Sequence, residues 1–348
     1  MAFSGIVGQQ RAKEFLKQVM TREKIPHAYL FTGIPGIGKR SMAMALAMAL
    51  NCREPVNREG CNRCPPCRQI LSRNFPDFLS ISPDGQNIKI GQIRELNRRL
   101  SFAPMSGRYR VCVVHRAETM TNEAANSFLK TLEEPPPGNI LILDATEPLD
   151  LLPTIVSRCQ RVSFQPLSAQ YMATWLVENR GLKEEIAIVL ARISGGSLGR
   201  TLRMCEAGFL EKRQEWLERL VGLHSLSKEN ALEMALECAG EDKNVGLDIT
   251  ETGEAGLTDM LSMWKMWYRD LLILKEEGAH HLLVNVDFFH KLKSMVGSFS
   301  IDSLGNSVFI IDQAQRDLQQ RRNPTLLMEH VILGLKGIYE NQDHKFPQ

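Results

Sequence analysis

The chain has 348 residues, 43% of them apolar and 24% charged, with 42 lysines and arginines against 40 aspartates and glutamates. This composition excludes a disordered chain and a disulfide-stapled miniprotein, and the length predicts two or three domains. A net charge of +2 neither demands nor excludes nucleic acid. The longest apolar candidate for a membrane span, Met42–Leu50, is too short, and the N-terminus lacks the order of a signal peptide. We therefore expect a cytoplasmic protein without a membrane partner.

Short β-like runs alternate with helical stretches in the first part of the chain. Residues 28–32, 110–115 and 139–143 are compact β-rich runs bounded by polar or Gly/Pro-rich segments. Residues 41–51 and 121–134 have helical composition and spacing. Strands that alternate with helices predict an α/β domain with a largely parallel sheet.

The remainder of the chain reads as helical. Residues 168–204 predict a small helical unit, and nearly everything from residue 209 onward predicts further helices. The acidic, glycine-containing stretch 240–256 predicts a loop. One helical face carries large apolar side chains that we interpret as core and not as a ligand site: Met260, Trp264, Trp267, Leu271 and Leu274.

A glycine-rich turn connects the first β-like run to the helix that follows it. Gly33, Gly36 and Gly38 precede Lys39 in the sequence GIPGIGK. Glycines let backbone N–H groups approach phosphates, the helix N-terminus favours anions, and the lysine reaches the outer phosphates. The turn therefore predicts a phosphate-binding loop, with a chance glycine-rich turn as the alternative.

The residues that would hold magnesium are missing from this site. The motif requires Ser or Thr after the lysine, but Arg40 stands there, and Ser41 comes one place too late. The strand over 110–115 ends in His115-Arg116, where a hydrolase of this type has an acid. Glu118 in the following turn is the alternative acid. The pattern predicts a nucleotide fold without a hydrolysis site.

Four of the eight cysteines form a cluster. Cys52, Cys61, Cys64 and Cys67 lie within one short insertion, and CxxC steps let one turn of chain present two ligands. Four thiolates predict a closed structural zinc site. The spacing alone leaves an iron–sulfur cluster and unliganded cysteines as alternatives. Apart from Cys159, the scattered cysteines are expected in the core: Cys112, Cys205 and Cys238.

The order of these pieces resembles the clamp-loader branch of the AAA+ family. The phosphate loop and the cysteine insertion are two points of similarity. Four further segments of this chain are similar to segments of the family: Ile6–Gln9, His27–Phe31, Ala124–Pro135 and Gly195–Arg200. The resemblance gives Thr146 the sensor 1 position and places Arg200 near sensor 2. It is looser in the helical part beyond, which is similar to the family's oligomerisation collar.

The triplet Ser157-Arg158-Cys159 is typical of the same family. The resemblance makes Arg158 an arginine finger, offered to nucleotide bound by the neighbouring subunit. A guanidinium beside the γ-phosphate stabilises the charge of the transition state and can be supplied in trans. For an isolated triplet, an ordinary exposed arginine is the alternative.

The resemblance also implies a domain organisation. An AAA+ P-loop domain of α/β class, with a parallel sheet and a zinc module at 52–67, is expected over residues 1–165. A small helical lid is expected over 166–208, and an all-α collar for oligomerisation over 209–348.

Two subunit types of the bacterial DNA polymerase III clamp loader share this pattern. The tau/gamma motor keeps Ser or Thr after the lysine and an acidic strand end, whereas the delta-prime type often departs from both. In Arg40, His115 and Arg116 the chain therefore resembles the delta-prime type. This resemblance implies a stator subunit that does not hydrolyse ATP and binds it weakly at most, through Gly38 and Lys39. Its partners would be tau/gamma and delta in a heteropentamer, which loads the sliding clamp onto primed DNA within the DNA polymerase III holoenzyme.

Two other functions remain as alternatives. One is a diverged tau/gamma-type motor that still hydrolyses ATP. The other is a stand-alone zinc-dependent DNA-binding protein, against which the near-neutral charge argues, because affinity for duplex DNA depends largely on phosphate neutralisation.

Overall fold

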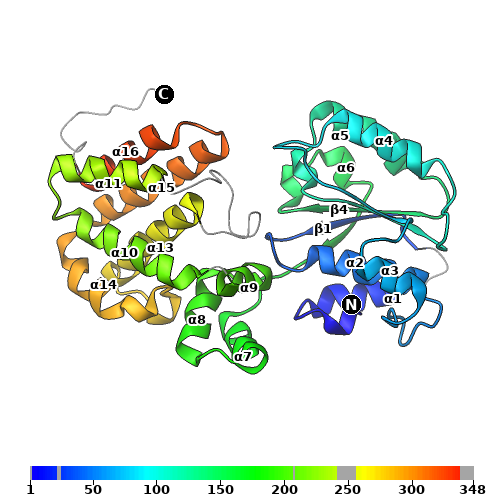
Figure 1. Cartoon of the computed structure of the whole chain (residues 1–348), viewed down its shortest axis with the longest axis horizontal. Coiled ribbons are helices and arrows are strands. Elements are labelled where there is room, and N and C mark those ends of the chain that lie inside the picture. The colour runs from blue at the N-terminus through cyan, green and yellow to red at the C-terminus, as the bar shows by residue number, and fades with distance from the viewer. Residues whose placement is uncertain (1, 22–24, 207, 241–255, 338–348) are drawn as a thin grey trace. The chain divides into compact units, whose positions relative to one another are not determined.

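The computed structural model describes residues 2–21, 25–206, 208–240 and 256–337 (Figure 1). The chain forms two compact units, residues 1–167 and 168–348. The division between them falls close to the predicted end of the first domain at residue 165. The loop predicted over 240–256 lies, except for its end residues, outside the described part of the chain. No helix among the described residues is long and apolar enough to cross a membrane.

The first unit contains a five-stranded sheet in the order β2-β3-β4-β1-β5, in which every pairing is parallel. The three predicted β-like runs form the three central strands, β1 (Ala28–Thr32), β3 (Arg110–Val114) and β4 (Asn139–Ala145). The two edge strands, β2 (Phe78–Ile81) and β5 (Gln160–Ser163), were not predicted. The parallel α/β sheet is thus confirmed, with two more strands than the sequence indicated.

Helices cover both faces of this sheet, as Figure 1 shows. Alternate side chains of the central strands enter two separate cores, so that Tyr29 and Phe31 belong to one and Leu30 to the other. The first core is completed by η1 (Phe3–Gly5), α1 (Gln10–Val19), α2 (Lys39–Asn51) and α3 (Pro65–Leu71). The second is completed by α4 (Ile90–Leu100), η2 (Ala117–Thr119), α5 (Asn122–Glu133) and α6 (Pro153–Val156).

The carboxyl ends of the parallel strands meet at one edge of the sheet, where α/β proteins place their ligand sites. The predicted phosphate loop leaves this edge after β1, His115 follows β3, and Thr146 follows β4. The fold therefore gathers residues that are far apart in the sequence.

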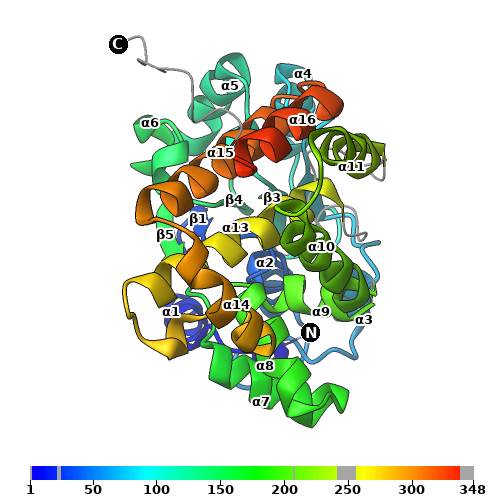
Figure 2. The same ribbon diagram turned by 90° about the vertical axis from the view of Figure 1, so that its left-hand side faces the viewer.

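The second unit is helical throughout its described residues. Its helices are α7 (Ala169–Arg180), α8 (Glu184–Ile193), α9 (Leu198–Glu206), α10 (Phe209–Leu223), α11 (Lys228–Gly240), α13 (Leu257–Lys275), α14 (Phe289–Met295), α15 (Ile301–Gln319) and α16 (Pro324–Leu335). Helix α13 packs against α10, α14 and α15, and α16 packs against α11 and α15 (Figure 2). The predicted apolar face of α13 is core, because Met260, Trp264, Trp267 and Leu271 are buried and Leu274 packs against the same cluster.

A smaller apolar cluster lies between α7 and α8. It contains Met172, Leu176 and Ala187, whereas Ile193 of α8 and Met204 of α9 join the main core of the unit. The division into a lid over 166–208 and a collar over 209–348 therefore stays a prediction.

The scattered cysteines only partly follow expectation. Cys112 and Cys238 are buried, but Cys205 is exposed, so its placement in the core was wrong. Cys205 lies on α9, whose buried residues are Thr201 and Met204. Burial of a single cysteine cannot be inferred from its residue type alone.

Candidate functional site

The phosphate loop has the backbone that its glycines were predicted to allow. Gly33, Gly36 and Gly38 have φ angles of 147°, 73° and 106°, which side chains other than glycine rarely adopt. A Cβ on Gly33 would lie 2.8 Å from the carbonyl oxygen of Phe164. The N–H of Gly33 donates to the carbonyl of Thr146 at 3.0 Å. The structure thus brings the phosphate loop and the predicted sensor 1 residue together.

Lys39 is the first residue of α2, and its side chain turns back into the loop. Its Nζ donates to the carbonyl oxygen of Gly33 and, at 3.4 Å, to that of Ile34. Burial lowers the pKa of Lys39, while the nearby charges of Asp144 and Glu118 raise it, with burial prevailing. The ammonium group is therefore satisfied by the loop itself.

Arg40 occupies the position at which a phosphate loop of this kind has its magnesium ligand. The residue is exposed, on the first turn of α2. Partial burial and the charge of Arg73 lower the pKa of Arg40, whereas Asp144 raises it. Arg40 thus adds positive charge next to the loop and supplies no oxygen ligand for a cation.

The end of β3 interacts with a carboxylate that the sequence analysis did not identify. His115 Nδ1 donates to Asp144 Oδ2 at 2.6 Å, and the backbone N–H of Arg116 donates to Asp144 Oδ1 at 3.1 Å. Asp144 is 6% exposed. Burial raises the pKa of Asp144, but His115, Arg116 and Lys39 outweigh burial and hold it below its usual range. Both carboxylate oxygens therefore accept hydrogen bonds from the chain itself.

Glu118, the alternative acid, lies in η2 at the same edge of the sheet. Its Oε2 is buried and has no hydrogen-bond partner among the described residues. Burial and the charge of Asp144 raise the pKa of Glu118, against smaller opposing effects of Lys39 and Arg116. The edge thus contains two carboxylates, of which Asp144 is the more fully bonded.

Arg158 follows α6 at the surface of the first unit. Its Nη2 donates to Glu133 Oε1 at 2.5 Å, and its Nη1 donates to the carbonyl oxygen of Thr154 at 2.8 Å. The side chains of Arg158 and Glu133 are 34% and 49% exposed. The guanidinium group is therefore accessible and is held by two acceptors from its own chain.

Arg200, predicted near sensor 2, lies on α9 in the second unit. Its Nη2 donates to Asp259 Oδ1 on α13 at 3.0 Å, and Asp259 is fully buried. The Nε of Arg200 is buried and has no hydrogen-bond partner among the described residues. The contacts of Arg200 within this unit are those of an ion pair joining two helices.

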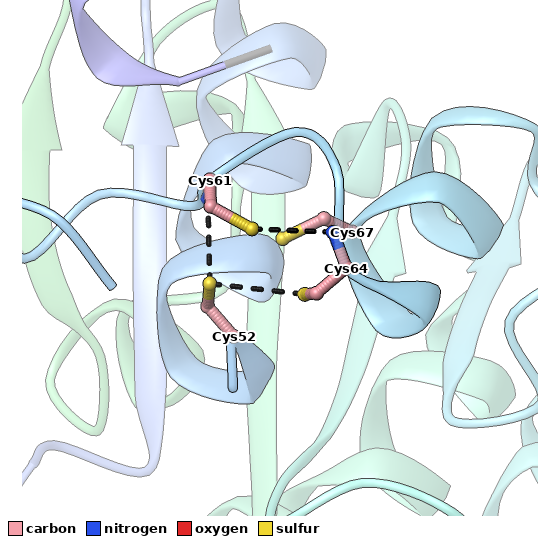
Figure 3. Close-up of side chains that lie close together, drawn as sticks. All are labelled: Cys52, Cys61, Cys64 and Cys67. Atoms are coloured by element: carbon pink, nitrogen blue, oxygen red, sulfur yellow. Dashed lines mark hydrogen bonds between the residues drawn. The ribbon is translucent and has the colours of Figure 1, made fainter. Parts of the chain in front are cut away.

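The four clustered cysteines come together, as Figure 3 shows. Cys52 follows the last turn of α2, Cys61 lies in the turn that comes next, and Cys64 and Cys67 lie at the start of α3. Their four sulfur atoms lie within 4.8 Å of one another, and the Cys52 and Cys64 sulfurs are 3.9 Å apart. Four thiolate ligands of one zinc ion lie about 3.8 Å apart, because a Zn–S bond is about 2.3 Å long. The cluster could therefore hold a metal ion.

Backbone groups support thiolates in this cluster. The N–H of Cys61 donates to the sulfur of Cys52 at 3.3 Å, and the N–H of Cys64 donates to the sulfur of Cys61 at 3.2 Å. The backbone N–H groups of Cys64 and Arg63 lower the pKa of Cys61 to about 6, whereas burial raises the pKa of Cys67. A bound cation would stabilise the ionised form of all four thiols.

Glycine and a carboxylate shape the module around the cysteines. A Cβ on Gly60 would lie 2.7 Å from the Cβ of Met48 and 3.3 Å from the sulfur of Cys67. The carboxylate of Glu59 binds Lys17 at 2.6 Å and accepts from the hydroxyl of Ser4 at 2.8 Å. The module is thus attached to α1 and to the N-terminal segment.

Comparisons with known proteins give consistent matches. A family model described as "DNA polymerase III, delta subunit" matches residues 8–168. The DNA polymerase III subunit delta' of Bacillus subtilis is 30% identical over 331 residues, which cover 94% of this chain and 96% of that relative. The subunit tau of Bacillus subtilis is 27% identical, over 96% of this chain and 61% of that relative. The subunit delta' of Escherichia coli is 31% identical, over 56% of this chain and 59% of that relative.

Proposed function

The chain belongs to the family of DNA polymerase III clamp-loader subunits that includes delta' and tau/gamma, and on this premise we propose that it is a delta'-type subunit that does not hydrolyse ATP. Its contribution to ATP-dependent clamp loading is Arg158, supplied to nucleotide on a neighbouring subunit. Its own phosphate loop serves as a structural element with weak affinity for nucleotide at most.

The observation that carries this proposal is that two positions of the motif, where a magnesium ion needs oxygen ligands, have none. Arg40 offers no oxygen, and His115 stands where β3 needs an acid. The nearest buried carboxylate, Asp144, accepts from His115 and from the N–H of Arg116. Magnesium stabilises the charge on the transferred phosphoryl group, so a site that cannot hold it loses most of its hydrolytic power.

The exposure of Arg158 supports a role in trans. The guanidinium lies at the surface, in the triplet Ser157-Arg158-Cys159, and its partner Glu133 is half-exposed. When water attacks the γ-phosphorus of ATP and the bond to the β–γ bridging oxygen breaks, negative charge increases on the leaving ADP. A guanidinium donates hydrogen bonds to that charge without gaining or losing a proton.

We propose zinc as the ion of the cysteine cluster. A closed set of four thiolates suits a structural zinc ion, and four sulfurs within 4.8 Å of one another fit a single central ion. Cys52, Cys61, Cys64 and Cys67 would hold it. The ion would fix the module against α2 and α3 and leave no open position for catalysis.

The partners in this proposal are the tau/gamma and delta subunits of a heteropentamer in the cytoplasm. The sliding clamp and primed DNA would be engaged by the assembled complex. Support comes from the relatives, which are themselves subunits of DNA polymerase III.

Reconstitution with motor subunits tests the proposal. In the complex, Arg158→Ala is expected to lower DNA-stimulated ATP turnover about tenfold or more, because an arginine finger contributes at least that much to kcat. Arg161→Ala is the matched control, since Arg161 is an exposed arginine on the neighbouring strand β5. Equal turnover of the wild-type and Arg158→Ala complexes would show that Arg158 is not the finger.

The rival function is a motor subunit that has rearranged its magnesium site. It is favoured by one observation, the presence of both Asp144 and Glu118 at the edge of the sheet near Lys39. An ATPase assay on the isolated chain separates the two functions. Magnesium-dependent turnover that Lys39→Ala abolishes would establish the motor and overturn our assignment.

A further inference from the structure

The guanidinium of Arg158 is held on one side only. Nη2 donates to Glu133 Oε1 on the last turn of α5, and Nη1 donates to the carbonyl of Thr154 on α6 and, at 3.4 Å, to the hydroxyl of Ser157. No acceptor for Nε of Arg158 is present among the described residues. Because a guanidinium is a rigid plane with five N–H groups, these contacts fix its orientation.

The free side of the group has the geometry that a phosphate requires. Nη2 carries two hydrogens, of which the bond to Glu133 uses one, and the contacts with Glu133, Thr154 and Ser157 leave the N–H of Nε unused. These two donors form the second bidentate edge of the guanidinium, which matches two oxygens of a phosphoryl group. The contacts with Glu133 and Thr154 therefore leave donors of the guanidinium for a phosphate.

We infer that Glu133 is a positioning residue for Arg158: it orients the guanidinium so that the edge formed by Nε and Nη2 faces the nucleotide of the neighbouring subunit. This inference rests on the proposed function of Arg158 as an arginine finger. It adds a second residue of this chain, on a different helix, to the machinery of the partner's reaction.

The exposure of the pair argues against a mainly structural role. An ion pair between side chains that are 34% and 49% exposed contributes little to folding, because water screens the charges and both side chains lose rotamer freedom. The same loss of freedom is useful in catalysis. A guanidinium already fixed in its reactive orientation pays no further ordering cost when the transition state forms.

The test is steady-state ATP turnover in the reconstituted complex, with five variants of this chain. Glu133→Ala is expected to lower kcat about fivefold, with KM for ATP unchanged because the motor's own loop binds the substrate; fivefold corresponds to about 1 kcal/mol. Glu133→Asp, which keeps the charge, is expected to recover part of this loss. Glu134→Ala is the matched control, since Glu134 is an exposed neighbour at the C-terminal cap of α5.

The double variant Glu133→Ala/Arg158→Ala shows whether Glu133 acts through Arg158. We expect its kcat to equal that of Arg158→Ala alone, because the pair works as a unit. Independent, multiplying effects would overturn the inference, and so would a kcat of Glu133→Ala that equals or exceeds the wild type. If Arg158→Ala still lowers kcat, either result leaves the proposed role of Arg158 as the arginine finger standing. If Arg158→Ala has the kcat of the wild type, the proposed function itself is contradicted.

Discussion

The ion pair between Arg200 and Asp259 allows a quantitative test of what Arg200 does. Asp259 is fully buried, Arg200 is 18% exposed, and the pair joins α9 to α13. Arg200→Ala leaves the carboxylate of Asp259 buried without its cationic partner, a change that costs about 3–5 kcal/mol in comparable pairs. Asp259 lies in the first turn of α13, where backbone N–H groups and the helix dipole support a negative charge. We therefore expect the lower end of that range, about 3 kcal/mol.

Tryptophan fluorescence reports on this unit alone. All four tryptophans belong to the second unit: Trp175, Trp216, Trp264 and Trp267. With a urea m-value of about 2 kcal/mol/M, a loss of about 3 kcal/mol lowers the unfolding midpoint by about 1.5 M. Arg203→Ala is the matched control, because Arg203 is an exposed arginine on α9, and its midpoint is expected to stay near the wild type. If the Arg200→Ala midpoint coincides with that of Arg203→Ala, the ion pair is not a structural link.

The purified chain is expected to contain one zinc ion per molecule by metal analysis, and Cys64→Ser to lose the ion and to melt at a lower temperature. Lys39→Ala is expected to leave ATP turnover of the reconstituted complex within about twofold of the wild type, because this ammonium binds loop carbonyls. Asp77→Asn removes the charge of a fully buried carboxylate that pairs with Arg110 and accepts from three backbone N–H groups. We expect these three N–H groups to exchange their hydrogens faster in the variant at pH 7. Burial raises the pKa of Asp77, but these amides and Arg110 outweigh it and lower the pKa, so the stabilisation is complete above about pH 4 and disappears as the pH falls through the depressed folded value. The wild type and the Asp77→Asn variant should therefore converge in acid. Cys205 is expected to react with a thiol reagent in the folded chain, whereas buried cysteines react only after denaturation, as a timed labelling assay measures.

The central strands of the sheet were predictable because burial on both faces demands continuous apolar runs. β1 occupies residues 28–32, the run that the sequence indicated, and its five residues are all buried. The edge strands are not buried on both faces, so they need no continuous apolar run. β5 has a single buried residue, Val162, and β2 has none. Their pairing depends on backbone bonds to a neighbour far along the chain, which periodicity does not reveal.

The grouping of the four cysteines and the glycine backbone of the turn over 33–39 were predictable because each depends on neighbouring residues. CxxC steps and GIPGIGK hold their geometry within a turn or two of chain, so spacing alone brings the right atoms together. Asp144 was missed for the opposite reason. It extends β4 beyond the apolar run 139–143, and its partner His115 comes from the adjacent strand, 29 positions earlier. The pairing of Glu133 with Arg158 spans 25 positions and was equally invisible.

One property is common to four charged groups, Lys39, Asp144, Arg158 and Arg200: each bonds to a group of its own chain. A buried charge that loses its ligand costs several kcal/mol unless the protein supplies a new partner. Lys39 bonds to loop carbonyls, Asp144 to His115, Arg158 to Glu133, and Arg200 to Asp259. Each of these groups is therefore bonded by the chain that carries it, which lowers the cost of its burial. Arg158 and its partner Glu133 are the half-exposed pair, and their bond leaves further N–H donors of the guanidinium for the phosphate that we propose it binds.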